Sequence, residues 1–268
     1  AAGLQAWQYA GHPKVRLTQQ AITANHRANT LDARLRLTPG PRLKFGTLQS
    51  ASASAVRPDA IQRIAGFPTG EIYHPDLLAK SANRLRRTGA FSSVSLRADD
   101  RVATDDSLDF AVAVEDMPPR RLTFGAELSS TDGLEITASW MHRNLFGGAE
   151  KLRFETRLSG LGSSNDLDGR IALRLDRPAT LGPDDNLFYL LEAERLDEEH
   201  YTATQGLGAI GMRRVYSDQL FGEASIGFNT ILASDAFGER RFKYITGYIR
   251  AEYDRRNSRV DASQGYFL

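Results

Sequence analysis

Apolar and polar residues alternate through most of the chain, and the alternation is strongest from residue 120 onward. A period of two residues predicts β-strands with one apolar face and one polar face. Clusters of Gly, Asn, Asp and Ser at residues 131–133, 147–148, 160–166 and 182–186 predict the turns between them. We expect about eight antiparallel strands in this part of the chain. The runs cover residues 122–128, 134–140, 152–158, 171–175, 187–194, 207–212, 224–228 and 244–253.

The first 120 residues contain a weak internal repeat. Gly11 and Gly89 each precede an alternating run, a polar turn and a second alternating run. Each second run ends in a Pro-Arg pair, at residues 41–42 and again at 119–120. The glycines and the pairs are both separated by the same interval, 89 − 11 = 120 − 42 = 78 residues. A fixed interval of this size indicates tandem modules.

A complete module lies inside this repeat. Residues 43–47 alternate and predict a short strand. Pro58 and Pro75 each suit the first position of a helix, and Gly66 and Gly89 suit the residue after each helix ends. Two strands follow, so the predicted order is β-α-α-β-β. Such a sheet can bury one face against the two helices.

The module contains Gly-Phe-Pro-Thr-Gly at residues 66–70, then Tyr73, and Thr-Gly-Ala-Phe at residues 88–91 followed by Val94. These residues resemble the POTRA domain family. Residues 43–118 are identified as a complete module, and residues 1–42 as the C-terminal part of a preceding one. The resemblance implies structural rather than chemical roles for its motif residues, and a sheet edge that accepts an extended client segment. The motif residues are Gly70, Tyr73, Leu85, Gly89, Phe91 and Val94.

The second half of the chain contains Ser-Ser-Thr-Asp-Gly at residues 129–133, then Trp140, His-Arg-Asn-Leu-Phe-Gly at residues 142–147 and Glu-Lys-Leu at residues 150–152. These residues resemble the Omp85 superfamily of outer-membrane proteins. Its most specific motif is Arg143, Asn144, Leu145, Phe146 and Gly147, and the segment 254–257 with Gly265-Tyr266 is similar to a mid-barrel motif of that family. The resemblance identifies residues 119–268 as the first half of an Omp85-type barrel. Within the family the spacing is most like TamA, the outer-membrane subunit of the translocation and assembly module.

The resemblance implies an unusual extent and a fold class. Barrels of the family have about twice as many strands as are visible in this sequence, so we expect a fragment in which residues 265–268 begin another strand. The expected fold is mainly β with an α+β N-terminal part. POTRA modules are followed by an incomplete antiparallel transmembrane β-barrel.

The function implied by the resemblance is assembly or export of β-rich clients such as autotransporters. Expected partners are unfolded outer-membrane or secreted proteins, the lipid bilayer and an inner-membrane-anchored periplasmic protein. The barrel would lie in the bacterial outer membrane with the N-terminal modules in the periplasm. A BamA-like general insertase and a two-partner-secretion pore are the alternatives. The first strand would form a client-binding seam through Leu122, Phe124, Gly125, Ala126 and Leu128.

On pattern alone, a soluble β-sandwich or barrel explains the alternation equally well, because each membrane strand gives a weak signal. Two features favour a membrane barrel. The polar face carries charges of both signs, including Glu135, Glu155 and Arg157, as a wet lumen would. The apolar face carries large residues in strand after strand. Aromatic residues near strand ends predict a girdle at the membrane boundary, formed by Trp140, Tyr189, Tyr248 and Tyr253.

Composition and motif searches exclude several other classes. There is no cysteine, so disulfides and thiolate metal sites are impossible. The net charge is +1 and no basic stripe is present, so nucleic acid is not an expected partner. No apolar run reaches the ~18 residues of a membrane helix. The five histidines have no metal-ligand spacing, and the Gly206-x-Gly208-x-x-Gly211 pattern lies in a strand-like run with no helix after it. We therefore expect no catalytic site, metal or cofactor.

Overall fold

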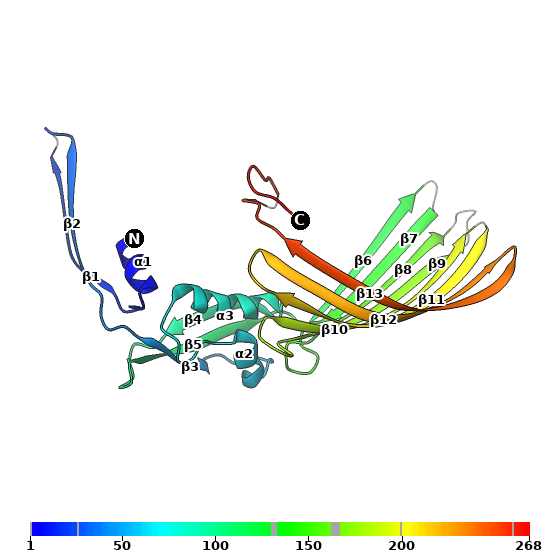
Figure 1. The fold of residues 1–268 in the computed structure, drawn as a ribbon, viewed down its shortest axis with the longest axis horizontal. Coiled ribbons are helices and arrows are strands. Elements are labelled where there is room, and N and C mark those ends of the chain that lie inside the picture. Colours follow the sequence, from blue (N-terminus) through cyan, green and yellow to red (C-terminus); the bar gives the residue numbers. More distant parts are fainter. Residues whose placement is uncertain (1, 26, 130–132, 162–166, 199, 259) are drawn as a thin grey trace. The chain divides into compact units, whose positions relative to one another are not determined.

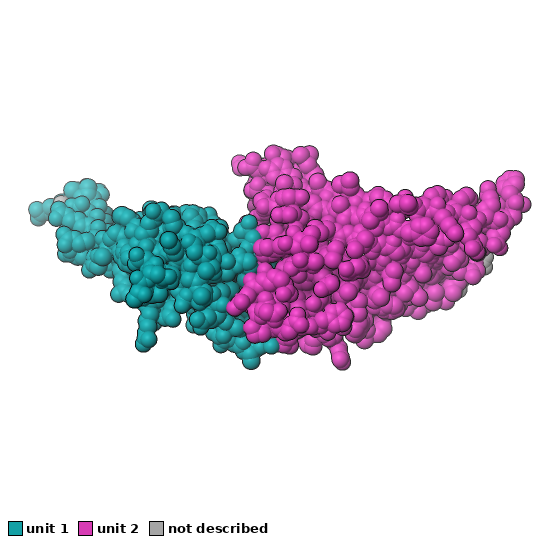
Figure 2. All heavy atoms as spheres, turned by 60° about the horizontal axis from the view of Figure 1, so that its bottom comes forward, with its two compact units in different colours: residues 1–54, 65–87, 91–115 teal, residues 55–64, 88–90, 116–268 magenta. Residues whose placement is uncertain are grey.

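A computed structural model describes residues 2–25, 27–129, 133–161, 167–198, 200–258 and 260–268. The predicted turn residues Thr131 and Asp132, and residues 162–166, lie outside these ranges. The chain divides into two compact units, coloured separately in Figure 2. Unit 1 comprises residues 1–54, 65–87 and 91–115, and unit 2 comprises residues 55–64, 88–90 and 116–268.

Unit 1 begins with a helix and a hairpin. Helix α1 (Ala2–Tyr9) precedes strands β1 (Arg16–Asn25) and β2 (Thr30–Thr38), which form a two-stranded antiparallel sheet (Figure 1). Gly11 has a positive φ of 95°, and its carbonyl accepts a hydrogen bond from Leu43 N at 3.0 Å. A positive φ suits glycine because it has no Cβ. Gly11 therefore turns the chain out of α1 and ties the hairpin segment to the start of the next module.

The predicted β-α-α-β-β order is confirmed. Strand β3 (Lys44–Ser50) is followed by α2 (Pro58–Ala65), α3 (Pro75–Arg87), β4 (Phe91–Ala98) and β5 (Ser107–Asp116). Both helices start at proline, as the sequence predicts. The strands form a three-stranded sheet in the order β3-β5-β4, in which β3 runs parallel to β5.

Unit 2 contains one large antiparallel sheet, and its eight strands confirm the expected number. The strands follow one another in the sheet in chain order, lie side by side and form a curved surface (Figure 1). Their bounds are β6 (Arg120–Ser129), β7 (Gly133–His142), β8 (Lys151–Leu161), β9 (Asp168–Pro178), β10 (Asp185–Glu198), β11 (Tyr201–Val215), β12 (Leu220–Asp235) and β13 (Gly238–Tyr253). We call the end where Arg120 begins β6 and Tyr253 ends β13 the proximal end, and the other the distal end.

Strands β6 and β13 are the edges of this sheet, and within the described residues they do not pair with each other. The fold class expected from the sequence is thus confirmed, as a β-α-α-β-β module followed by an open antiparallel sheet. No helix in the described parts of the chain combines the length and apolar character that crossing a membrane requires.

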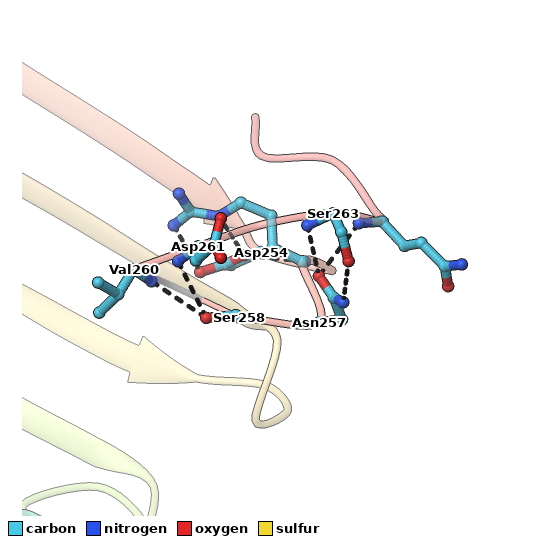
Figure 3. A network of polar contacts seen from close by, with 8 residues as sticks. Asp254, Asn257, Ser258, Val260, Asp261 and Ser263 are labelled. Carbon is cyan, nitrogen blue, oxygen red and sulfur yellow. Dashed lines mark hydrogen bonds and ion pairs between the residues drawn. The ribbon is translucent and has the colours of Figure 1, made fainter.

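Residues 254–268 fold back along the end of β13. Tyr253 and Leu268 exchange backbone hydrogen bonds of 2.9 and 3.0 Å, and Asp254 forms a single bridge with Phe267. Asn257 holds the loop between them, since its side-chain Oδ1 accepts from the backbone N–H groups of Ser263 and Gln264 (Figure 3). Residues 265–268, which are expected to begin another strand, contribute to this short antiparallel pairing.

Candidate functional site

The large sheet has one apolar and one polar face, which follow from its register. Residues paired across antiparallel strands share a face. One row of paired residues crosses all eight strands: Leu122, Trp140, Phe154, Leu173, Leu191, Gly208, Phe228 and Ile245. It contains no polar side chain apart from the indole N–H of Trp140.

The apolar face exposes large side chains, while part of the polar face is buried. On the apolar face Leu122, Phe124 and Leu191 are 60%, 71% and 60% exposed. On the polar face Asp176 and Phe188 are buried, at 8% and 2%. Monomeric soluble proteins rarely expose contiguous apolar patches of more than a few hundred Å². This face therefore fits contact with an apolar medium or another apolar surface.

The polar face carries a network of ion pairs. Arg170 contacts Glu192 at 2.6 Å, Arg157 contacts Glu135 at 3.4 Å, and Arg174 contacts Asp176 at 3.2 Å. Arg157 lies directly opposite Arg170 in the register of β8 and β9. Like charges in that arrangement repel, so the acidic partners on β7 and β10 offset the repulsion. A cavity of about 270 Å³ lies on this face between Thr123, Ser139, Glu155, Arg157 and Arg170.

The predicted seam residues all lie on edge strand β6. Four of them, Leu122, Phe124, Ala126 and Leu128, are paired with residues of β7 and have their side chains on the apolar face. The side chain of Leu128 is 82% exposed. Gly125 points to the polar face opposite Thr137, and a Cβ at Gly125 would lie 2.6 Å from Thr137 Oγ1. Within the described residues β7 is the single neighbour of β6. The outer edge of β6 is thus available for another strand.

The five predicted barrel-motif residues come together in the proximal turn between β7 and β8. Arg143 donates from its backbone N to Pro119 O and from Nη1 to Pro118 O, both at 2.8 Å. Asn144 Nδ2 donates to Ala55 O at 2.8 Å, and Asn144 Oδ1 accepts from Ala149 N at 2.9 Å. The motif thus ties this turn to the segments that precede α2 and β6, all within unit 2.

Glu150 supports the turn from inside. Its carboxylate is buried and accepts hydrogen bonds from Phe146 N at 3.3 Å and Gly148 N at 2.9 Å. Leu145 N also donates to Glu150 O at 3.1 Å. Gly147 has a φ of +83°, and its carbonyl accepts from Arg57 N at 2.9 Å. The side chain of Phe146 remains 62% exposed at the tip.

The residues of the predicted POTRA motif are buried or lie in turns of the module. Tyr73 is 8% exposed and stacks on Phe110 with ring centroids 6.3 Å apart. Burial raises the pKa of its hydroxyl above the ordinary value of 10.0. Leu85, Phe91 and Val94 are buried. Gly70 and Gly89 have φ values of +85° and +69°, so each needs the freedom of glycine.

The two edges of the three-stranded sheet are not equally available. Residues 70–73 run along the outer edge of β3, where Gly70 N donates to Phe45 O at 2.8 Å and Tyr73 N donates to Leu43 O at 2.9 Å. The other edge strand is β4. On β4, Arg86 donates from its side chain to Val94 O at 3.0 Å. The half of β3 next to residues 70–73 is therefore occupied, and β4 is the more open edge.

The predicted aromatic girdle is partly wrong. Trp140 and Tyr189 lie on the apolar face near the proximal end, and Tyr253 is on the same face at the end of β13. Tyr248 pairs with Ser225, which continues the polar row of Phe188 and Gly211. A shift of one residue moves a side chain to the opposite face. The sequence alone did not fix the register of the long strand β13 closely enough to place Tyr248.

Sequence reasoning missed two residues of the proximal turn, Ala55 and Arg57, and included Glu150 in the family resemblance without predicting that it supports the turn. Ala55 and Arg57 act through backbone atoms, so no side-chain pattern marks them. Glu150 had a signal, since it comes directly after a Gly-Gly-Ala segment. A Cβ at Gly148 would meet the carboxylate of Glu150, so a larger residue at this position would displace that carboxylate.

No protein-family model matches the sequence, and no curated protein matches it either. Solved structures do match. BamA from Haemophilus ducreyi lacking POTRA domains 1–3 has a TM-score of 0.72 and 13% identity, covering 97% of this chain and 53% of that one. CdiB from Acinetobacter baumannii has a TM-score of 0.64 and 10% identity, covering 91% and 47%.

CdiB from Escherichia coli is similar as well, with a TM-score of 0.56 and 10% identity, covering 94% of this chain and 48% of that one. These likenesses establish the fold. The chain spans about half the length of the structures it matches. The module and the open sheet of this chain therefore have the fold of the corresponding part of BamA and CdiB.

Proposed function

We propose that this chain belongs to the Omp85 superfamily and acts in the assembly or export of β-rich proteins at the bacterial outer membrane. The observation that carries the proposal is the open sheet of unit 2. Large side chains on its apolar face are exposed, residues such as Asp176 and Phe188 on its polar face are buried, and edge strand β6 carries apolar residues that are up to 82% exposed. Lipid is the medium that makes such a face favourable.

The positions of the apolar residues along successive strands support strands that are tilted in the membrane. Outward residues are mostly apolar over 122–128 on β6, 152–158 on β8, 187–193 on β10 and 245–253 on β13. When the spans are aligned by register, their centres move toward the proximal end by about one residue per strand. With a rise of about 3.3 Å per residue and a strand spacing of about 4.8 Å, this drift corresponds to a tilt of about 35°. Membrane barrels have tilts of about 35–45°.

The edges of the sheet then need partners. Hydrocarbon cannot satisfy unpaired backbone N–H and C=O groups, and each costs several kcal/mol. We infer that β6 and β13 are flanked by further strands in a closed barrel, and we refer to that assembly as the complete barrel protein. The pairing of β6 with its outer neighbour would form the seam, and a client strand would add to β6 when the seam opens.

The periplasmic end of the route would be the β-α-α-β-β module. Edge strand β4 would accept an extended segment of the client by strand addition, since the outer edge of β3 is partly occupied. Backbone pairing and burial of apolar side chains in lipid supply the driving force, so the proposed function needs no nucleotide, metal or catalytic group. Among members of the superfamily we favour a TamA-like role with autotransporter clients and an inner-membrane-anchored periplasmic partner.

A covalent clamp at the seam tests this function. Cysteines at Phe124 or Ala126 and on the strand that closes the complete barrel protein would form a disulfide across the seam. We expect the oxidised variant to lose client assembly and the reduced variant to regain it, because the clamp blocks access to the edge of β6. The measurement is the rate at which a client becomes folded and protease-resistant in reconstituted vesicles.

The matched control is a clamp inside the sheet. Ala138 and Thr156 are paired in register on β7 and β8, so cysteines at these two positions lock strands that stay together during function. Normal assembly by the seam-locked protein contradicts lateral opening.

The second candidate is an export pore of the two-partner-secretion type. The wall of charged residues on the polar face favours it, since Arg157, Arg170 and Glu192 would line an aqueous lumen. A seam-locked protein that still exports its client at the normal rate supports this pore over the insertase.

A further inference from the structure

Two cations stand at the distal boundary of the apolar face on β13. Along the outward side of this strand Ile249, Gly247 and Ile245 are followed by Lys243 and then by Arg241. Ile249 and Ile245 are 86% and 78% exposed, and Lys243 and Arg241 are exposed as well. Successive outward residues are about 7 Å apart, so both charges lie within reach of one group at the boundary.

Polar residues also lie on the outward side of the neighbouring strands, beside Lys243 and Arg241. Lys243 pairs with Thr230 on β12, just beyond Phe228, and Arg241 pairs with Leu232. Thr204 on β11 and Arg195 on β10 continue the row of Leu232 and Arg241. The distal limit of the apolar residues shifts by about one residue from each strand to the next. Along this limit, each of the strands β10–β13 carries a hydroxyl or cationic side chain.

The sheet continues past this boundary instead of stopping there. Strands β10 and β11 remain paired up to Glu198 and Tyr201, and β12 and β13 up to Asp235 and Gly238. Two acids share the outward side further along: Asp197, which pairs with Arg195 at 3.0 Å, and Glu239. The paired strands thus extend beyond the apolar face. Lys243 and Arg241 lie where the apolar face ends and this extension begins.

We propose that this surface, Lys243 and Arg241 with the hydroxyls of Thr230 and Thr204, binds the phosphate groups of lipids in the leaflet at the distal end. The proposal rests on the membrane residence proposed above. Long cationic side chains beside apolar residues extend toward headgroups while their stems stay in the apolar layer. Arginine and lysine donors with nearby hydroxyls suit phosphate oxygens. The position at the boundary points to lipid as the source of the phosphate.

The chain supplies a matched control next to the surface. Arg240 lies between the two cations in sequence, but its side chain is on the polar face and forms an ion pair with Asp235. Arg240→Gln removes the same charge from the same strand without changing the outward surface. The test variant is Arg241→Gln with Lys243→Gln.

The experiment uses the complete barrel protein in nanodiscs of phosphatidylcholine with a minor fraction of phosphatidic acid. Electron paramagnetic resonance of spin-labelled lipids gives the association constant of phosphatidic acid relative to phosphatidylcholine. Each cation near a membrane surface is worth about a fivefold preference for anionic lipid. We therefore expect the double variant, which loses two cations, to lose about 25-fold of the preference at low salt. The Arg240→Gln variant should keep it.

A second measurement separates failure of this inference from failure of the proposed function. Nitroxides at Leu173 and Ile249 report whether the apolar face lies in lipid. If they report lipid but the double variant retains the wild-type preference, or Arg240→Gln loses as much, phosphate binding at this surface is wrong. If they report water, the membrane residence itself is wrong and this inference falls with it.

Discussion

At the scale of single residues, the proximal turn shows how one buried carboxylate organises a backbone. Gly147 and Ala149 have φ values of +83° and +61°, and a positive φ is unfavourable for alanine. The bond from Ala149 N to Asn144 Oδ1 offsets part of that cost. Glu150 accepts from Phe146 N and Gly148 N on the other side of the turn. The motif is therefore explained by backbone geometry, with no chemistry assigned to it.

The first prediction follows from the burial of that carboxylate. Glu150→Ala leaves the N–H groups of Phe146 and Gly148 without their acceptor, and an unsatisfied buried donor costs about 1–3 kcal/mol. We expect the free energy of unfolding of the complete barrel protein to fall by about this amount in urea titrations. Glu198→Ala removes the same charge from an exposed position at the end of β10 and is the control. Equal loss in both variants would show that overall charge, and not the turn, is responsible.

The second prediction concerns the buried phenol of Tyr73. Burial raises its pKa, so the folded state disfavours the tyrosinate. A group with a raised folded pKa contributes stability below its unfolded pKa, here about 10, and loses it as the pH rises through the folded value. Tyr73→Phe keeps the ring stack and removes the ionisable group. Circular dichroism should place alkaline unfolding of unit 1 at a higher pH in this variant, whereas Tyr201→Phe, at an exposed position, should leave it unchanged.

At the scale of elements, the sequence predicted the order and type of the structure well. Prolines at 58 and 75 marked both helix starts, and alternation located eight strands. Strand ends were predicted less well. β11 extends over Tyr201–Val215, but Gly206, Gly208 and Gly211 break its apolar pattern, so the sequence run covers only residues 207–212. Cross-strand pairing extends such strands, and pairing is not visible in a single run of residues.

The contacts of the candidate site were also predicted only in part. The sequence marked Arg143 and Asn144 through their motif, but their partners Pro118, Pro119 and Ala55 are backbone carbonyls contributed from elsewhere in unit 2. Residue types carry no signal for such acceptors. Tyr248 was assigned to the wrong face because a single position of register decides it.

The third prediction tests the facing of the strands. Nitroxides at the outward positions Leu122, Leu152 and Leu173 of the complete barrel protein should collide with oxygen, which concentrates in lipid. Nitroxides at Arg121 and Arg153 should collide instead with a water-soluble nickel chelate, because these positions lie on the polar face. The opposite result would show that the two faces are interchanged.

A substitution tests the same assignment of the strand faces through its cost in free energy of unfolding. Leu173→Arg should destabilise the barrel by about 2–4 kcal/mol, the cost of a cation near the bilayer midplane. Leu232→Arg, nearer the distal boundary in the row of Arg241, should cost about 0–1 kcal/mol. Equal costs at the two positions would contradict an apolar face whose distal limit shifts from strand to strand. Urea titrations in vesicles supply the free energies.

At the scale of the whole molecule, the decisive feature is the pair of open sheet edges. Interior strands such as β8 and β10 have paired neighbours on both sides, whereas β6 and β13 have one each in the described residues. An exposed edge with apolar residues on one face is a site for pairing with another strand. The same property would serve the proposed client-binding seam and would make an isolated sheet prone to association. The proposed function and the instability would then have one physical origin.

The last prediction applies this reasoning to the 268-residue chain by itself. Its sheet exposes the edges of a ten-residue strand, β6, and a sixteen-residue strand, β13. In lipid these unpaired groups cost several kcal/mol each, and in water the exposed apolar face favours association. We expect the chain, refolded in detergent, to sediment as oligomers or aggregates, while the complete barrel protein sediments as a defined species under the same conditions. A chain that remained monomeric without detergent and unfolded in one cooperative step would contradict both the lipid-facing assignment and the need for flanking strands, because neither the apolar face nor the two edges would then require a partner.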